Sequence, residues 1–272
     1  MEHCEGAGSA TPVAGVGEHW HLHKEMELTF IERGEGVRVV GDNVAPFSAP
    51  ELVLLGSDLP HCWHGLRHST GCAVQFHWSL DHPLRSLPET ARLGDLWQRA
   101  ARGILFSPAV ASRVGARMTE LGNCEPLSRM GLFLQILGEI SATAPADVKP
   151  LSRTEFGLTG GLRHETAIAQ VVRHVLEHYA DPQPLEQVLR RAGMSKATFA
   201  RQFPRFTGST FTQFLGRVRL SHARQRILAG NDSVSAAAFA VGFNHLSHFN
   251  RSYRSFYGTT PGDDRRSDGT WC

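Results

Sequence analysis

The sequence of 272 residues lacks any run of apolar residues that approaches the ~18 needed to cross a membrane. Its first ten residues, MEHCEGAGSA, include acids but no basic segment, so we expect no secretory signal. It also lacks a C-x-x-C pair. Its cysteines are odd in number and dispersed, at Cys4, Cys62, Cys72, Cys124 and Cys272. Such a set is typical of reduced thiols, so we expect a cytoplasmic protein with no membrane partner.

The charge of the chain is unevenly distributed, although the formal net charge is only +2. Residues 1–150 hold 12 Lys and Arg against 17 Asp and Glu, a net charge of −5, whereas residues 151–272 hold 16 against 9, a net charge of +7. The asymmetry favours an acidic module joined to a basic module that binds nucleic acid. A chance imbalance on solvated surfaces is the alternative.

Residues 20–80 are expected to form β-strands. The segments 28–32, 51–56 and 72–78 are short and β-rich, and the sequence RGEG at 33–36 predicts a turn before a further strand, VRVVG. Short strands at this spacing favour a small barrel or sandwich.

Two stretches after residue 90 have apolar residues at helical spacing. The first stripe is Val110, Val114, Met118 and Leu121, and the second is Leu127, Met130, Leu134, Leu137 and Ile140. Two amphipathic helices after a barrel could cover its open side or pair two chains, and we favour pairing in a homodimer. Residues 141–163 are rich in Ala, Pro, Ser, Thr and Gly, which indicates a linker.

Beyond the linker, an internal repeat recurs after fifty residues. Phe199, Arg201, Phe203, Phe206 and Gly208 return as Phe249, Arg251, Tyr253, Phe256 and Gly258. The aromatic spacing i, i+4, i+7 places the rings on one buried helix face, with the arginine on the exposed face. Each copy follows a short helix and a glycine-bearing turn, LEQVLRRAGMS and VSAAAFAVGFN, which predicts two helix-turn-helix units joined by a long helix over 209–230. An ordinary helical bundle is the alternative.

The stretches PLEQVLRRAGMSKATFARQFPRFTG, FLGRVRLSHARQRIL and AVGFNHLSHFNRSYRSFYGTTP carry a resemblance. Over residues 165–266 the chain resembles the DNA-binding domain of AraC/XylS-type bacterial transcription regulators. The resemblance implies two helix-turn-helix units that lay their second helices into successive major-groove segments. Pro204 departs from the family pattern, because it stands inside the first recognition helix and is expected to kink or shorten it.

Candidate DNA contacts follow from the repeat and the resemblance. Arg201 and Arg251 could each donate two hydrogen bonds to guanine, and Asn250 suits adenine. The further candidates near bases are Lys196, Ala197, Thr198 and Ala200 in the first unit and Leu246, Ser247 and His248 in the second. Arg205, Arg217, Arg219 and Arg254 are expected to contact phosphates. We expect the second helix-turn-helix unit to contribute more to base recognition, because the first has Pro204 and small alanines where long side chains could contact bases.

The segment HWHLHKEME, residues 19–27, concentrates histidine and glutamate. With the AraC-type resemblance established, the N-terminal region is similar to cupin-type sensor barrels. Gly15, His21, His23, Glu27 and Gly34 match the first cupin motif, and His61 is placed like the histidine of the second. Three imidazoles and a carboxylate could bind a divalent metal such as Fe, Mn, Ni or Zn. The alternative is a metal-free pocket for an organic effector, with Trp63 and Phe76 as further walls.

The sequence therefore predicts an α+β chain with a cupin-like β-barrel, two following helices and an all-α double helix-turn-helix domain. We place the effector and dimerisation domain at 1–145, the linker at 146–164, the DNA-binding domain at 165–266 and a tail at 267–272. The expected function is a sequence-specific, effector-responsive transcription activator whose partners are promoter DNA, a small-molecule effector, a second copy and RNA polymerase. No catalytic residue is assigned, since no further acid–base or nucleophile–base pair stands out. A metal-dependent cupin enzyme, a metal sensor and a constitutive DNA binder are the alternatives.

Overall fold

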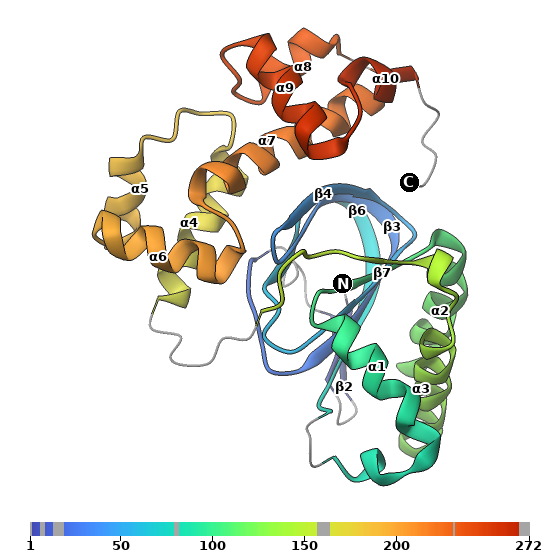
Figure 1. Ribbon diagram of the computed structural model, residues 1–272. Coiled ribbons are helices and arrows are strands. Elements are labelled where there is room, and N and C mark those ends of the chain that lie inside the picture. Colours follow the sequence, from blue (N-terminus) through green and yellow to red (C-terminus); the bar gives the residue numbers. More distant parts are fainter. Residues whose placement is uncertain are drawn as a thin grey trace. The chain divides into compact units, whose positions relative to one another are not determined.

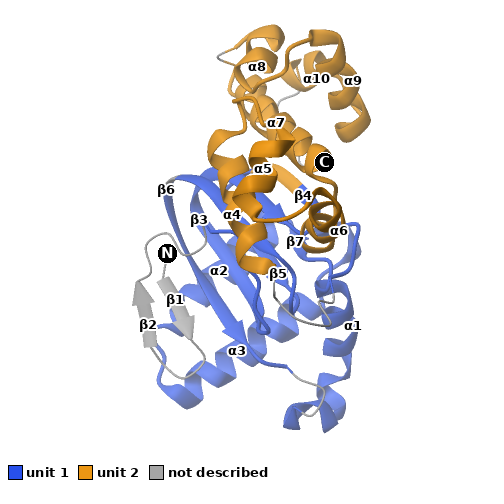
Figure 2. Cartoon of the chain, turned by 90° about the vertical axis from the view of Figure 1, so that its left-hand side faces the viewer, with its two compact units in different colours: residues 1–43, 47–160 blue, residues 44–46, 161–272 orange. Residues whose placement is uncertain are grey.

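The computed structural model describes residues 2–5, 9–12, 19–78, 82–156, 164–230 and 232–266. The chain forms two compact units (Figure 2). Unit 1 comprises residues 1–43 and 47–160, and unit 2 comprises residues 44–46 and 161–272. Among the described residues, none of the helices has both the length and the apolar character that crossing a bilayer requires.

Unit 1 contains a curled sheet with the strand order β2-β1-β6-β3-β5-β7-β8, and β4 also pairs with β3 (Figure 1). The strands are β1 Glu2–Glu5, β2 Ser9–Pro12, β3 Met26–Val40, β4 Asn43–Ser48, β5 Glu51–Leu55, β6 His61–Phe76, β7 Ile104–Phe106 and β8 Val148–Pro150. β1 runs parallel to β6, whereas β3 is antiparallel to both β5 and β6. Together with the helices below, the sheet confirms the expected α+β class.

β3 and β6 pair from Met26 opposite Phe76 to Val40 opposite His61, so the turn predicted at 33–36 is wrong. The chain continues as one strand with register irregularities between Ile31 and Val37. Glycine is needed here for the irregular strand itself, since Gly34 has a φ of 116°. A Cβ on Gly36 would lie 2.7 Å from the carbonyl oxygen of His64.

The two faces of the sheet bury different clusters, because successive side chains of a strand point to opposite sides. One face carries Leu28, Phe30, Leu52 and Leu54. Three helices cover this face, α1 Ala91–Ala100, α2 Pro108–Leu121 and α3 Pro126–Ser141, and short 3-10 turns occur at Pro83–Ser86, Pro88–Thr90 and Pro145–Asp147 (Figure 1). The opposite face carries Ile31, Val53, Leu55 and Trp63.

The pairing of two chains through α2 is not supported, because its apolar stripe is buried in its own unit. Val110, Val114, Met118 and Leu121 pack into the same cluster as Phe30 of the sheet. On α3 the C-terminal half is buried likewise, through Ile136, Leu137 and Ile140. Its N-terminal half remains exposed, with 85% of Leu127, 51% of Met130 and 37% of Leu134 accessible to solvent.

The linker predicted at 146–164 overlaps ordered structure of unit 1. β8 pairs with β7, and Leu151 and Phe156 are buried against the sheet. The Ser152 hydroxyl donates a hydrogen bond to Asp42 at 2.9 Å. Apolar burial thus extends to Phe156, and residues 157–163 of the predicted linker lie outside the described residues.

Unit 2 is helical in all of its described elements beyond residue 164. The helices are α4 Glu165–His178, α5 Leu185–Ala192, α6 Lys196–Thr207, α7 Phe211–Leu228, α8 Val234–Ala240, α9 Leu246–Tyr257 and α10 Pro261–Arg266. α7 begins with a capping box in which Thr210 and Gln213 bond to each other's backbone N–H groups. Phe214 near its start contacts the ring of Phe203, and Ile227 near its end joins the cluster of α8 and α9. α7 therefore links two small cores.

Candidate nucleic-acid interface and metal centre

The two predicted helix-turn-helix units form from the expected residues. α5 and α6 meet at Gly193, and α8 and α9 follow one another through Gly242, with φ values of 61° and 91°. α6 and α9 each contain 12 residues and end at a glycine in the left-handed conformation, Gly208 or Gly258. Equal lengths and equal C-terminal caps show that the repeat in the sequence is a repeat in the backbone.

Pro204 does not shorten the first recognition helix. α6 continues to Thr207, and the Gly208 N–H donates to the Pro204 carbonyl at 2.8 Å. The matching bond in α9 runs from Gly258 to Arg254 at 2.9 Å. The consequence of Pro204 is chemical, because the equivalent position in the second unit holds a cation.

The aromatic face of each repeat is buried, as its spacing predicts. Phe199 and Phe203 lie in the first core, and Phe249 and Tyr253 in the second. The Tyr253 hydroxyl donates to the buried carboxylate of Asp264 at 2.7 Å, and Arg224 lies 2.8 Å from the same carboxylate.

Arg201 and Arg251 point away from these cores and are exposed. In the described part of the chain, neither guanidinium has an ion-pair or hydrogen-bond partner, so bracing of the fold does not explain them. The other exposed candidates are Lys196, Ala197, Ala200, Arg205, Ser247, His248, Asn250 and Arg254, while Thr198, Arg217 and Leu246 are half-buried. Both recognition helices therefore present the predicted side chains on their outer faces.

Arg219, which we expected to contact phosphate, makes hydrogen bonds within unit 2. Its guanidinium donates to the carbonyl oxygens of Tyr179 at 2.7 Å and Asp181 at 3.0 Å. Burial lowers its pKa below the usual value for arginine. The side chain thus caps the end of α4 and stabilises unit 2.

A hollow of about 610 Å³ lies beside α9. Asn250, Arg251 and Arg254 line it together with Thr260 and residues near it. Two arginines at one hollow suit an anionic oxygen such as a phosphate, whereas the Thr260 hydroxyl donates to Asp263. Thr260 was absent from our sequence-based candidates, because only the packing of the segment after α9 brings it there.

In unit 1 the four predicted metal-ligand residues come together. His21 and His61, forty residues apart, form an isolated β-bridge with backbone hydrogen bonds of 3.1 and 2.9 Å. One ligand atom from each of His21, His23, Glu27 and His61 lies within 4.8 Å of the others. Lys24 pairs with Asp58 at 2.8 Å and joins the two segments beside the cluster.

The three imidazole rings share one hydrogen-bonding pattern, although their planes are inclined to one another. Each Nδ1 faces a backbone carbonyl oxygen, of His19 for His21 at 2.6 Å, of Glu25 for His23 at 2.9 Å, and of Leu59 for His61 at 2.8 Å. A carbonyl can only accept, so each Nδ1 carries the proton, and in a neutral His21 or His61 ring the lone pair is on Nε2. This is the arrangement by which proteins orient histidines toward a metal. The Nε2 of His23 instead donates to Glu27 at 3.1 Å, so this ring would have to release that proton to bind a metal.

Glu27 is buried and held from several sides. Burial alone would raise its pKa, but hydrogen bonds from His23, Thr29 and Gln75 together with nearby His61 hold that pKa below its usual range. Burial, reinforced by His21, lowers the pKa of His61 to about 3. The pocket thus contains an ionised carboxylate opposite a neutral buried imidazole.

This donor set fits a divalent first-row metal. The His61 Nε2 atom is buried and has no hydrogen-bond partner among the described residues, so its lone pair is available to a cation. Three imidazoles and one carboxylate are ligands that Zn²⁺, Fe²⁺ or Ni²⁺ accept. Gly15 of the sequence motif lies outside the described residues.

Of the two aromatic residues predicted beside the histidines, Trp63 lies next to the cluster and Phe76 does not. Trp63 neighbours His61 but donates its indole N–H to Glu51 at 2.9 Å. Phe76 is on the opposite face of β6 and packs against Trp97 and Phe133, so its predicted place beside the histidines is wrong. Instead its neighbour Gln75, which pairs with Glu27 across the strands, reaches the cluster. Gln75 was missed because only the strand register shows that it faces Glu27. Its one signal in the sequence is a polar residue within the apolar stretch CAVQF.

Comparisons with known proteins agree with the structure of unit 2. Residues 188–267 match the family model described as a helix-turn-helix domain. The HTH-type transcriptional activator RhaS of Salmonella agona is 26% identical over 272 aligned residues, which cover 90% of this chain and 87% of RhaS.

Two solved structures are also similar. A probable AraC family transcriptional regulator from Rhodopseudomonas palustris is 31% identical and covers 37% of this chain and 95% of its own, with a TM-score of 0.36. ToxT from Vibrio cholerae is 14% identical and covers 91% of this chain and 92% of its own, with a TM-score of 0.38.

The matched domain and RhaS do not favour the metal-dependent enzyme that we kept as an alternative. The matched model covers both α6 and α9, whose exposed arginines form the candidate interface. The chain is therefore a DNA-binding transcription regulator of the helix-turn-helix class.

Proposed function

We propose that the chain is an AraC-type, effector-responsive activator that acts in the cytoplasm on promoter DNA, with RNA polymerase as its partner. The observation that carries the proposal is the pair of equal recognition helices with outward Arg201 and Arg251. The likeness to an activator over 90% of the chain supports the direction of the effect.

The proposed mechanism is linkage between unit 1 and DNA binding. Unit 1 is a cupin-like sensor in this proposal, and an effector that prefers one of its conformations shifts how unit 2 engages DNA. A tenfold difference in affinity between two conformations supplies about 1.4 kcal/mol of bias.

Selection from a random duplex pool tests this function. The full-length chain should enrich one sequence and bind it roughly a thousandfold or more tightly than scrambled DNA. Enrichment of no sequence at moderate salt would refute sequence-specific binding.

The proposed homodimer rests on the exposed half of α3. Leu127, Met130 and Leu134 recur at helical spacing and are accessible in the single chain. Sedimentation at micromolar concentration should show a dimer that Leu127→Glu weakens, because the change places a charge in an apolar interface. Ser128→Glu, on the neighbouring exposed position, is the matched control. A chain that stays monomeric on DNA would rule the dimer out.

A metal sensor is a second candidate, favoured by the three Nε2 atoms that converge with Glu27. His21, His23, Glu27 and His61 would hold the ion, which would crosslink the segment before β3 to the start of β6.

Metal content and Zn²⁺ titration of the full-length chain test the candidate. We expect one ion per chain, and His21→Gln with His23→Gln should weaken binding roughly a hundredfold. His178→Gln, on exposed α4 surface, should change nothing. Unchanged Zn²⁺ affinity in the double variant would eliminate the site.

A further inference from the structure

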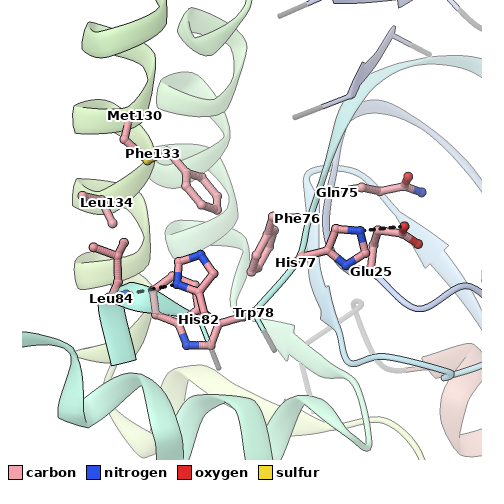
Figure 3. Close-up of a pocket in the computed structure, with 10 residues that line it drawn as sticks. All are labelled: Glu25, Gln75, Phe76, His77, Trp78, His82, Leu84, Met130, Phe133 and Leu134. Carbon is pink, nitrogen blue, oxygen red and sulfur yellow. Dashed lines mark hydrogen bonds and ion pairs between the residues drawn. The ribbon is translucent and has the colours of Figure 1, made fainter. Parts of the chain in front are cut away.

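A pocket of about 470 Å³ lies outside the imidazole cluster, between the end of β6 and α3 (Figure 3). Its walls come from Phe76 and Trp78 at the end of β6, Leu84 of the following 3-10 turn, and Phe133 of α3. The volume is within the range of pockets that bind small molecules, roughly 300–1,000 Å³.

The aromatic walls of this pocket are fixed by other rings. Phe76 meets Phe133 edge to face with centroids 5.0 Å apart, and both Phe76 and Trp78 lean on Trp97, at 5.7 and 5.4 Å. Trp78 also stacks on His82 at 4.4 Å (Figure 3). Rings that are already ordered lose little entropy when a ligand binds between them.

The polar end of the pocket is acidic. Among the described residues that line it, Glu25 supplies the one carboxylate, and none is Lys or Arg. Glu25 pairs with His77 at 3.2 Å (Figure 3), and 69% of the His77 side chain is exposed. The second Glu25 oxygen lies 3.6 Å from the Nδ1 of His23. The pair with His77 is weak because His77 is exposed, so a ligand cation can replace the His77 imidazole.

We propose that this pocket binds a small organic cation with a flat apolar body, held by the faces of Phe76, Trp78 and Phe133 and by the Glu25 carboxylate. Aromatic faces attract cations, whereas an anion would meet the Glu25 carboxylate and, as bases, only the His77 and His82 imidazoles.

Two lining residues connect the pocket to the imidazole cluster. Gln75 donates to Glu27 at 2.8 Å, and the backbone carbonyl of Glu25 accepts from His23 Nδ1. A ligand that moves either residue changes the cluster, so the inference rests on the proposed effector response and gives it a chemical class.

Calorimetry on the full-length chain with two matched probes tests the proposal. Phenethylamine, a cation, should bind with a Kd of about 1 mM or tighter, and 3-phenylpropionate, an anion of the same shape, at least roughly tenfold more weakly. Glu25→Gln and Trp78→Ala should each weaken the amine roughly tenfold, because each removes one of the two attractions. Glu35→Gln, an exposed acid on β3, is the control.

Each outcome decides the proposal. Equal binding of the two probes, no amine binding at millimolar concentration, or native affinity in Glu25→Gln overturns it. Melting curves without probe verify that the variants are folded. DNA binding of the same samples separates the two claims: intact operator binding without amine binding refutes the pocket alone, whereas amine binding without operator binding refutes the proposed function.

Discussion

The recognition helices α6 and α9 have the same length and the same glycine caps, yet they carry different surfaces. The leading positions of α6 hold Lys196, Ala197 and Ala200, and those of α9 hold Leu246, Ser247 and Asn250 in the same order. Near the helix end, Pro204 stands opposite Arg254. The backbone and the aromatic core repeat, but the side chains that we propose to read bases do not. We therefore expect the two helix-turn-helix units to contribute unequally to DNA affinity and specificity.

The largest expected effect concerns the aromatic core that the two helix-turn-helix units share. Phe199 and Phe249 are buried equivalents, so Phe199→Ala and Phe249→Ala should each lower the free energy of unfolding by about 3–5 kcal/mol. Urea denaturation of the full chain, with helix content as the signal, measures both. If one of the two changes were nearly neutral, the cores would not be equivalent.

A smaller loss of stability is expected at Arg219. Arg219→Ala removes both hydrogen bonds to the end of α4 and should cost about 1–3 kcal/mol of stability. The ratio of specific to non-specific DNA affinity should stay constant, since the guanidinium supports the fold. Binding at several salt concentrations, below the melting transition, provides the comparison. If the Arg219→Ala variant kept native stability but its DNA affinity depended less on salt, by the amount expected for one lost phosphate contact, Arg219 would be a phosphate contact after all.

The smallest effect concerns the position at which the two helix-turn-helix units differ in charge, Pro204 in the first and Arg254 in the second. Arg254→Ala should lower the slope of log affinity against log salt by about one, because it removes one phosphate neutralisation. Pro204→Arg should make the same slope steeper by about one, since it gives the first helix-turn-helix unit the cation that the second has at Arg254. Slopes unchanged in both variants would mean that neither position faces DNA.

The helical domain could be predicted from sequence to a large extent. The spacing of Phe199, Phe203 and Phe206, and its repetition fifty residues later, is a local signal that needs no tertiary information. The hydrogen bonds of Arg219 could not be predicted, because its partners, the carbonyls after α4, lie forty residues away in the chain.

The sheet was harder to predict, for a physical reason. A shift of one residue in strand register moves every side chain to the other face. Phe76 was therefore placed with the histidines in error, while its neighbour Gln75 contacts Glu27. Gly34 and Gly36 suggested a turn because glycine serves bulges and turns alike. The convergence of His21 and His61 was predicted from the resemblance to cupin-type barrels, and the structure brings them together in a β-bridge before β3 begins at Met26.

The measurement that tests the account most directly compares Arg251→Ala with Arg201→Ala on a selected operator and on scrambled DNA. The account predicts that Arg251→Ala costs about 1–3 kcal/mol on the operator, relaxes preference at one or two base pairs and lowers the ratio of the two affinities. Arg201→Ala should lower that ratio less, because its neighbours are alanines. An unchanged ratio for a folded Arg251→Ala variant would contradict base reading by the second unit.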